Sequence, residues 1–195
     1  MKKTKFLLTL AGGLLVFSLA QLAEAKTVKN AVIKDIDSSD KMLEVVKGGK
    51  TYTVSAGSAK IVRGTGEKKI KFSKLKEGDV IKIEGSFDGE SVTATRIQNY
   101  SFNDKRYAIF YGKVDSLDES ASTFKISTLD RGSQNVTVIG STDIEDEDND
   151  DINLSDLKAD DRMLLRGKWS DKYNTITKTD WIEVLDDDDY DDLDD

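Results

Sequence analysis

The 195-residue chain contains no cysteine, no histidine and no proline. Without cysteine it forms no disulfide and has no thiol nucleophile, and without histidine it lacks the usual general base and the commonest metal ligand. Its Asp and Glu residues stand in runs and turns rather than singly among apolar strand residues, where burial would raise the pKa of a carboxyl. These absences argue against an enzyme, and we predict no catalytic residue.

The N-terminus has the three parts of a secretory signal peptide. Three lysines stand in the first five residues, Phe6–Ala20 is an uncharged apolar run of 15 residues, and Ala23-Glu24-Ala25 places small residues where a signal peptidase reads. A membrane-spanning helix needs about 20 apolar residues, so a retained anchor is the weaker interpretation. We expect residues 1–25 to be removed and the mature protein to be exported to a bacterial periplasm or the extracellular space, which fits the lack of disulfides.

A 14-residue phrase occurs twice in the mature chain. "FSKLKEGDVIKIEG" at 72–85 is echoed by "LSDLKADDRMLLRG" at 154–167, and "VTATRI" at 92–97 is echoed by "ITKTDWI" at 176–182. The offset between matching positions stays between 81 and 84 residues along the chain. This spacing is too long for a solenoid repeat and is typical of a small domain.

The repeat therefore predicts two tandem domains. We place them at residues 27–101 and 107–185, joined by a short linker at 102–106. The segment 186–195 holds eight aspartates, and we expect a disordered acidic tail there.

Period-two alternation dominates both repeats, as in "KTYTVS" and "SVTATRI", and is typical of strands. The pairs Gly48-Gly49, Asp88-Gly89 and Gly132-Ser133 separate such runs and favour tight hairpin turns. No segment keeps a helical period over three turns. We expect an all-β protein of two small OB-like β-barrels with about five strands each.

Within the repeated phrase, each position has a structural interpretation. Ser73 or Ser155 begins a single helical turn, and the leucine two residues later points into the core. The glycine that ends the phrase, Gly85 or Gly167, lets the following strand bend. We interpret the repeated segment as a structural element of the fold rather than as a binding site.

This pattern resembles an uncharacterised family of exported bacterial domains with small OB-like barrels. In that family a phrase of the form L-x-x-L-K-x-G-D-x-V-x-V-x-G is followed by I-T-A-x-x-I. Residues 74–85 with 92–97 match well, whereas in the second repeat Asp160 replaces the glycine and Arg162 replaces the first valine. The resemblance covers nearly all of residues 28–185, and it implies a fold but no activity.

The chain carries a net charge of −8, distributed unevenly. The first repeat is basic, and its positive charge is concentrated in one run at 60–76. Such a run suits a polyanion, and a solvated loop is the alternative interpretation. The candidate polyanion-binding residues are Lys60, Arg63, Lys68, Lys69, Lys71 and Lys74.

Carboxylates are dense in the second repeat and in the tail. Ca²⁺ takes several oxygen ligands, so a weak calcium site is one interpretation of "EDEDNDD", and a solvated loop is the other. The candidate metal ligands are Glu145, Asp146, Asp148, Asp150 and Asp151. In a third interpretation, this loop or the acidic tail lies against the basic run of the first repeat.

Aromatic residues gather in two places. Tyr100, Phe102, Tyr107, Phe110 and Tyr111 stand at the join between the repeats and could hold the two barrels together. A second set in the second repeat could line a sugar-binding face, or could be ordinary hairpin packing. Its members are Trp169, Tyr173 and Trp181.

We therefore predict an exported, non-catalytic binding module for an envelope polymer or a protein. The alternative is a structural or spacer protein, whose acidic loop and tail bind cations weakly or pair with the basic run. The basic run lacks interleaved aromatics for base stacking, which argues against nucleic acid. No cofactor is expected apart from weakly bound Ca²⁺. No apolar stretch after residue 25 could cross a membrane, so we expect the mature protein not to be an integral membrane protein.

Overall fold

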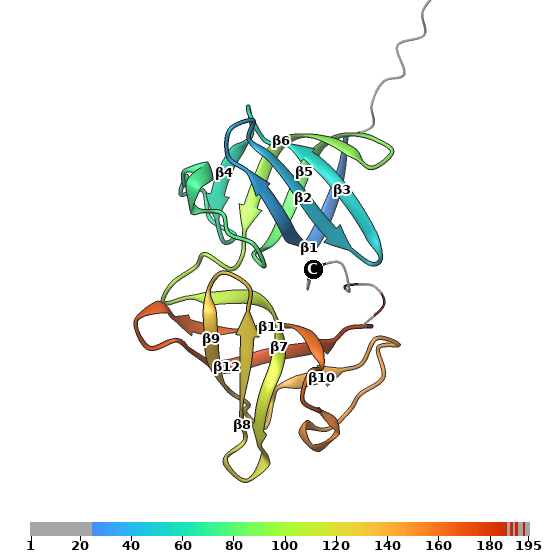
Figure 1. Cartoon of the computed structure of the whole chain (residues 1–195). Coiled ribbons are helices and arrows are strands. Elements are labelled where there is room, and N and C mark those ends of the chain that lie inside the picture. The colour runs from blue at the N-terminus through green and yellow to red at the C-terminus, as the bar shows by residue number, and fades with distance from the viewer. Residues whose placement is uncertain (1–24, 187, 189, 191–192, 194–195) are drawn as a thin grey trace, which may run out of the picture.

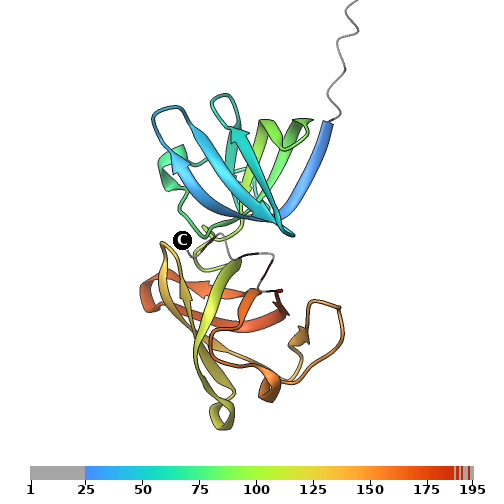
Figure 2. The ribbon, with the colours of Figure 1, turned by 45° about the vertical axis from the view of Figure 1, so that its right-hand side comes forward.

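The computed structural model describes residues 25–186, 188, 190 and 193, which form two β-barrels, one above the other in Figures 1 and 2. The predicted signal peptide lies outside these residues, apart from Ala25. The fold is all-β, as predicted, because its only helical segments are single 3₁₀ turns in the described part of the chain. None of the described helices is long and apolar enough to cross a membrane.

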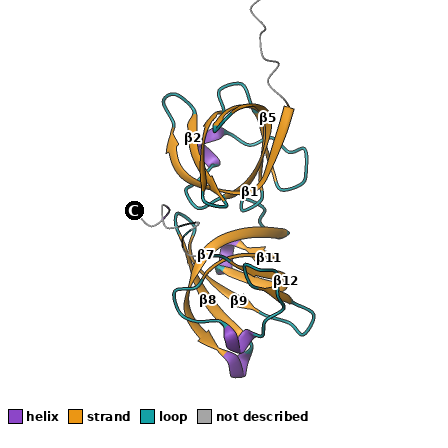
Figure 3. Ribbon diagram, turned by 90° about the vertical axis from the view of Figure 1, so that its right-hand side faces the viewer, coloured by secondary structure: helices purple, strands orange, loops and turns teal. Residues whose placement is uncertain are grey.

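The first barrel is a six-stranded sheet in the order β3-β2-β1-β5-β6-β4. A parallel pairing of β3 with β6 joins the sheet into a ring, which Figure 3 shows in the upper domain. The remaining strand, β4, adds in parallel to β6. The elements are β1 (Ala25–Asp37), β2 (Met42–Lys47), β3 (Lys50–Ser55), β4 (Lys60–Arg63), the 3₁₀ turn η1 (Phe72–Lys74), β5 (Val80–Asp88) and β6 (Ser91–Asn99).

The second barrel repeats this plan in the order β10-β12-β11-β7-β8-β9, and a parallel pairing of β12 with β9 joins it. The tandem repeat of barrels is therefore present in the structure. Its elements are β7 (Tyr107–Asp118), η2 (Glu119–Ala121), β8 (Thr123–Thr128), β9 (Gly132–Thr137), β10 (Asp143–Glu145), η3 (Leu154–Asp156), β11 (Arg162–Ser170), η4 (Asp171–Tyr173) and β12 (Thr175–Val184).

The repeated phrase forms the same structure in both barrels. After the 3₁₀ turn, Leu75 and Leu157 are buried in their respective cores. The carboxylate four residues after each leucine accepts a hydrogen bond from the backbone N–H three residues before it, Asp79 from Lys76 at 3.0 Å and Asp161 from Lys158 at 2.7 Å. This bond closes the turn that leads into β5 or β11, so the phrase forms the same folding element in both barrels.

The glycine at the end of each phrase stands where two strands approach closely. The register between β5 and β6 shifts between Glu84 and Gly85, and that between β11 and β12 shifts around Gly167. A Cβ at Gly85 would lie 2.2 Å from the Thr93 carbonyl oxygen, and a Cβ at Gly167 would lie 2.5 Å from Ile176 Cγ2. Only a glycine leaves room for the strand to bend at these points.

Each barrel has its own core, and a third apolar cluster lies between them, which we call the seam. Tyr190 stacks on Tyr111 at 5.8 Å between ring centroids, and both side chains are buried. The seam consists of Val32, Val46 and Val80 of the first barrel, Tyr111, Leu164 and Leu185 of the second, and Tyr190 and Leu193.

Two seam residues belong to the predicted disordered tail. Residues 187, 189, 191–192 and 194–195 of that tail lie outside the described residues. Tyr190 and Leu193, the two apolar residues that interrupt the aspartates, are 2% and 6% exposed. The segment therefore contributes apolar side chains to the joint between the barrels, which its composition did not indicate.

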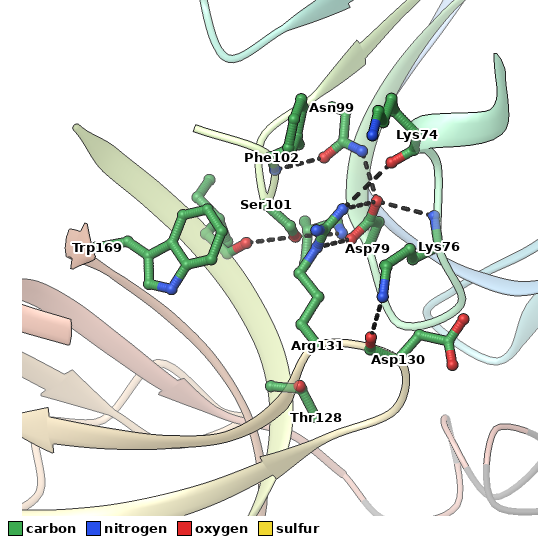
Figure 4. Close-up of polar contacts among 12 residues, drawn as sticks. Lys74, Lys76, Asp79, Asn99, Ser101, Phe102, Thr128, Asp130, Arg131 and Trp169 are labelled. Carbon is green, nitrogen blue, oxygen red and sulfur yellow. Dashed lines mark hydrogen bonds and ion pairs between the residues drawn. The ribbon is translucent and has the colours of Figure 1, made fainter. Parts of the chain in front are cut away.

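A buried ion pair also ties the barrels together (Figure 4). Arg131, in the β8–β9 turn of the second barrel, donates to both carboxylate oxygens of Asp79, from Nε at 2.5 Å and from Nη2 at 2.7 Å. Asn99 Nδ2 donates to the same carboxylate at 2.5 Å. Burial raises the pKa of the Asp79 carboxyl, and the Arg131 guanidinium opposes that rise.

Ser101 makes a third connection. Its buried hydroxyl donates to the Ile109 carbonyl of the second barrel at 2.6 Å and accepts from the Val80 N–H of the first at 2.8 Å. With the seam and the ion pair, this hydroxyl fixes the two barrels relative to each other.

Candidate anion-binding groove between the domains

An open groove of about 710 Å³ lies between the barrels beside the linker. Of the twelve described residues that line it, five are basic and none is acidic. Tyr100, Tyr107 and Ile109 supply apolar surface, and Asn30, Thr65 and Asn103 supply polar groups. The basic residues are Lys105, Arg106, Arg166, Lys168 and Lys178.

Backbone hydrogen bonds hold the linker at the rim of the groove. Lys105 N–H donates to the Trp169 carbonyl at 3.0 Å, and Trp169 N–H donates to the Arg106 carbonyl at 2.9 Å. Asn103 Nδ2 donates to the Tyr107 carbonyl at 2.5 Å. Because the linker is paired in this way with β11, its two basic side chains are held on the same side as those of the strand.

The other wall of the groove comes from the bulge between β11 and β12. The register shift around Gly167 leaves Lys178 in the left-handed region, with φ of +51°. Lys168 and Lys178 thus reach the groove from the irregular part of the ladder. The glycine of the repeated phrase therefore shapes the groove as well as the barrel.

Arg166 is held on the groove wall by two partners. Its guanidinium carbon lies 4.8 Å from the centroid of the Tyr107 ring, and its Nη1 forms an ion pair with the Asp180 carboxylate. Stacking and ion pairing fix the direction of the guanidinium and so pre-organise it. The Asp180 carboxylate offsets part of its charge.

A second hollow of about 280 Å³ adjoins the groove and shares Thr65, Asn103 and Arg106 with it. Arg63 and Lys68 line it, as does one carboxylate, Glu67. Hydrogen bonds from Arg96 and Lys60 hold the pKa of the exposed Glu67 carboxyl at about 2, so it stays ionised and paired.

The predicted polyanion-binding residues line different hollows in the structure. Arg63 and Lys68 lie beside the groove, in the second hollow. Lys60 forms an ion pair with Glu67, and Lys69 lines another small hollow with Lys60. Lys74 lies on the face where its carbonyl accepts from Arg131, and Lys71 lines none of these hollows.

The predicted sugar-binding face does not form either. Trp169 is 2% exposed, packs edge-on against Phe110 and donates from its indole nitrogen to Gln134 at 3.1 Å, so its ring belongs to the second core. Trp181 packs against the seam instead. Tyr173 is 65% exposed, with Lys172 over its ring. The three side chains therefore face different surroundings.

The acidic loop brings together a different set of carboxylates from the predicted one. Glu145 and Asp151 meet Asp143, and one oxygen of each lies within 4.8 Å of the others. The Asp146 carboxylate instead accepts hydrogen bonds from the N–H groups of Asp148 and Asp150, both at 3.0 Å, and these bonds close the loop. Asp143 was missed because it precedes the acidic run in the sequence.

Weak calcium binding at this loop stays a prediction from the sequence. If it occurs, a calcium titration followed by amide NMR will give saturable shifts at 143–151, and Glu145→Gln with Asp151→Asn will remove them. Magnesium is the control, because equal shifts with magnesium would mean screening of charge rather than a site.

Two segments, residues 31–98 and 111–184, match the profile of one family, a domain of unknown function designated DUF5666. The two matches cover most of the chain and fall on the two barrels. The chain belongs to the DUF5666 family. A search of curated proteins gave no match.

Most of the groove lies at the junction of the two DUF5666 repeats. Lys105, Arg106 and Tyr107 stand in the interval between the matched segments, and the other basic groove residues come from β11 and β12 of the second repeat. Sequence reasoning missed all five cations, because they are scattered through an acidic half of the chain. The one available signal was "DKRY", a basic pair beside an aromatic at the linker.

Proposed function

We propose that this protein is an exported, non-catalytic module that binds an anionic ligand in the groove between its two barrels. The observation that carries the proposal is the concentration of five cations, without a carboxylate, among the described residues lining a ligand-sized groove of an acidic protein. A cleft lined by one sign of charge focuses the field and attracts the opposite charge. Clefts of about 300–1,000 Å³ are typical of sites for small ligands.

The fixed joint supports binding as well. The barrels are held by a buried ion pair, a buried hydroxyl and the seam, so the groove exists before any ligand arrives. A pre-formed site loses less entropy on binding than one that must be ordered.

The test is a charge reversal at the groove with a matched control. Lys168→Glu with Lys178→Glu changes the net charge by the same amount as Lys50→Glu with Lys158→Glu, two lysines that do not line the groove. The probes are an oligogalacturonate, a sulfated oligosaccharide, inorganic polyphosphate and a single-stranded DNA, measured by calorimetry at low and physiological salt.

We expect at least one probe to bind the wild-type protein saturably, and the groove pair to weaken it at least about tenfold, or 1.4 kcal/mol. The control pair should bind within about twofold of wild type. Equal losses of affinity in both double variants would mean that the effect comes from net charge alone. The proposal would be overturned if none of the probes bound saturably.

A structural or spacer role is the second candidate, and the same rigid joint favours it. Two barrels that are locked together hold their outer surfaces at a fixed distance from each other, as a spacer requires. If no probe binds, and self-association or shape responds only to salt, this candidate replaces the first.

A further inference from the structure

The groove is the longer part of a basic path that crosses from one repeat to the other. Its smaller part is the second hollow, and the cationic side chain common to both is Arg106 of the linker. Gly64, at φ of +56°, lies so close to Asn103 that a Cβ on it would be 2.8 Å from Asn103 Nδ2. The groove and the second hollow adjoin here, since they share Thr65, Asn103 and Arg106.

Seven cationic side chains line this path, and the one carboxylate among its described lining residues is Glu67. Lys60 and Arg96 already neutralise Glu67. The path joins two cations of the basic run, Arg63 and Lys68, to five that the run does not contain. A compact anion could contact only part of such a path, whereas a linear ligand with charges at intervals could contact all of it.

The lining favours a polysaccharide over a nucleic acid. Single-stranded nucleic acids are bound on successive aromatic platforms, but the path offers two tyrosines, and Arg166 already stacks on the Tyr107 ring. Asn30, Asn103 and Thr65 line the same groove as the cations, and their amide and hydroxyl groups suit sugar hydroxyls. The net negative charge of the chain also opposes densely charged polymers more than it opposes sparsely charged ones.

We infer that the ligand of this groove is a linear acidic polysaccharide, bound along the path from Lys168 and Lys178, over Arg106, to Arg63 and Lys68. Carboxylate or sulfate groups pair with the cations, and sugar hydroxyls bond to the amides that line the same groove. This inference rests on the proposed function and adds the class of the ligand and its course.

The experiment compares short and long oligomers on variants at each end of the path. The probes are the di- and octasaccharide of galacturonate and of a sulfated glycan, with single-stranded DNA and polyphosphate of similar charge as competitors. Arg63→Glu with Lys68→Glu changes the far end, and Lys168→Glu with Lys178→Glu changes the near end. Circular dichroism melting of each variant confirms that it is folded.

We expect an octasaccharide to bind at least about tenfold more tightly than its disaccharide, and the far-end variant to abolish that difference while leaving the disaccharide within about twofold. Equal affinity for short and long oligomers, with no effect of the far-end variant, would overturn the extended course while leaving an anion site in the groove. Tighter binding of DNA or polyphosphate than of either glycan would overturn the polysaccharide. Loss of all binding would overturn the proposed function as well.

Discussion

Replacing Arg131 by methionine is expected to lower the free energy of unfolding by about 3 kcal/mol at pH 7, because it leaves the Asp79 carboxylate buried without its counter-charge. Asp79 is 0% exposed, and without Arg131 its described partners are the Asn99 amide and the Lys76 N–H. Guanidinium unfolding followed by circular dichroism measures the loss. Amide exchange in the β8–β9 turn and at Ser101 should rise with it, since the ion pair joins the two barrels.

The pH dependence of this loss has a definite sign. Burial raises the pKa of Asp79 in the folded state, and removing the guanidinium that opposes the rise raises it further. A carboxyl whose pKa is higher in the folded state binds more protons when folded than when unfolded. Its contribution to the free energy of unfolding is therefore complete below the unfolded pKa of about 3.9, and it is lost as the pH rises through the folded pKa. The deficit of Arg131→Met should therefore shrink as the pH is lowered toward 4.

Two further variants test the cause. Adding Asp79→Asn to Arg131→Met removes the buried charge and should recover part of the loss, as a double-mutant cycle measures. Asp161→Asn alters the equivalent carboxylate of the second repeat, which closes its turn without bridging the barrels, and should cost about 1 kcal/mol. A loss in Arg131→Met no larger than that of Asp161→Asn would mean that the ion pair contributes little to the joint.

Gly85→Ala is expected to cost about 3 kcal/mol, because its Cβ meets backbone rather than a movable side chain. The nearest atoms are the Thr93 carbonyl oxygen at 2.2 Å and Ala94 Cα at 2.9 Å, both on β6. Relieving the clash requires β6 to move away from β5, where the strand bends to close the first barrel. Thermal and guanidinium unfolding of the purified variant measure the cost.

Three other glycines give a graded comparison. Gly167→Ala should cost less than Gly85→Ala, because its nearest contact is the Ile176 side chain at 2.5 Å. Gly89→Ala has open space around it but φ of +59°, so we expect about 1 kcal/mol of backbone strain. Gly57 has neither a close contact nor a positive φ, so Gly57→Ala should stay within about 0.5 kcal/mol of the wild-type stability. If Gly85→Ala and Gly57→Ala lowered the stability equally, the bend in β5 would not depend on its close approach to β6.

The sequence by itself determined the fold class, the two repeats and the role of the repeated phrase. These features depend on local patterns, such as alternation for strands, Gly-Gly and Asp-Gly for hairpins, and a leucine and a glycine at fixed places around each bend. Because the segment occurs in two barrels with separate cores, the residues common to both copies indicate which positions the fold requires.

Only the tertiary structure decided where the charges meet. The sequence placed a candidate polyanion site in the basic run, of which two cations line the second hollow. The groove itself collects its cations from the linker and from two strands of the acidic repeat. Trp169 shows the same limit, since alternation could not say which face of β11 is buried. The partnership of Asp79 with Arg131 joins residues 52 positions apart in different repeats, and no local pattern indicates it. Contacts between domains depend on how the barrels are stacked, and that stacking is set by a seam whose members are few, apolar and far apart in the chain.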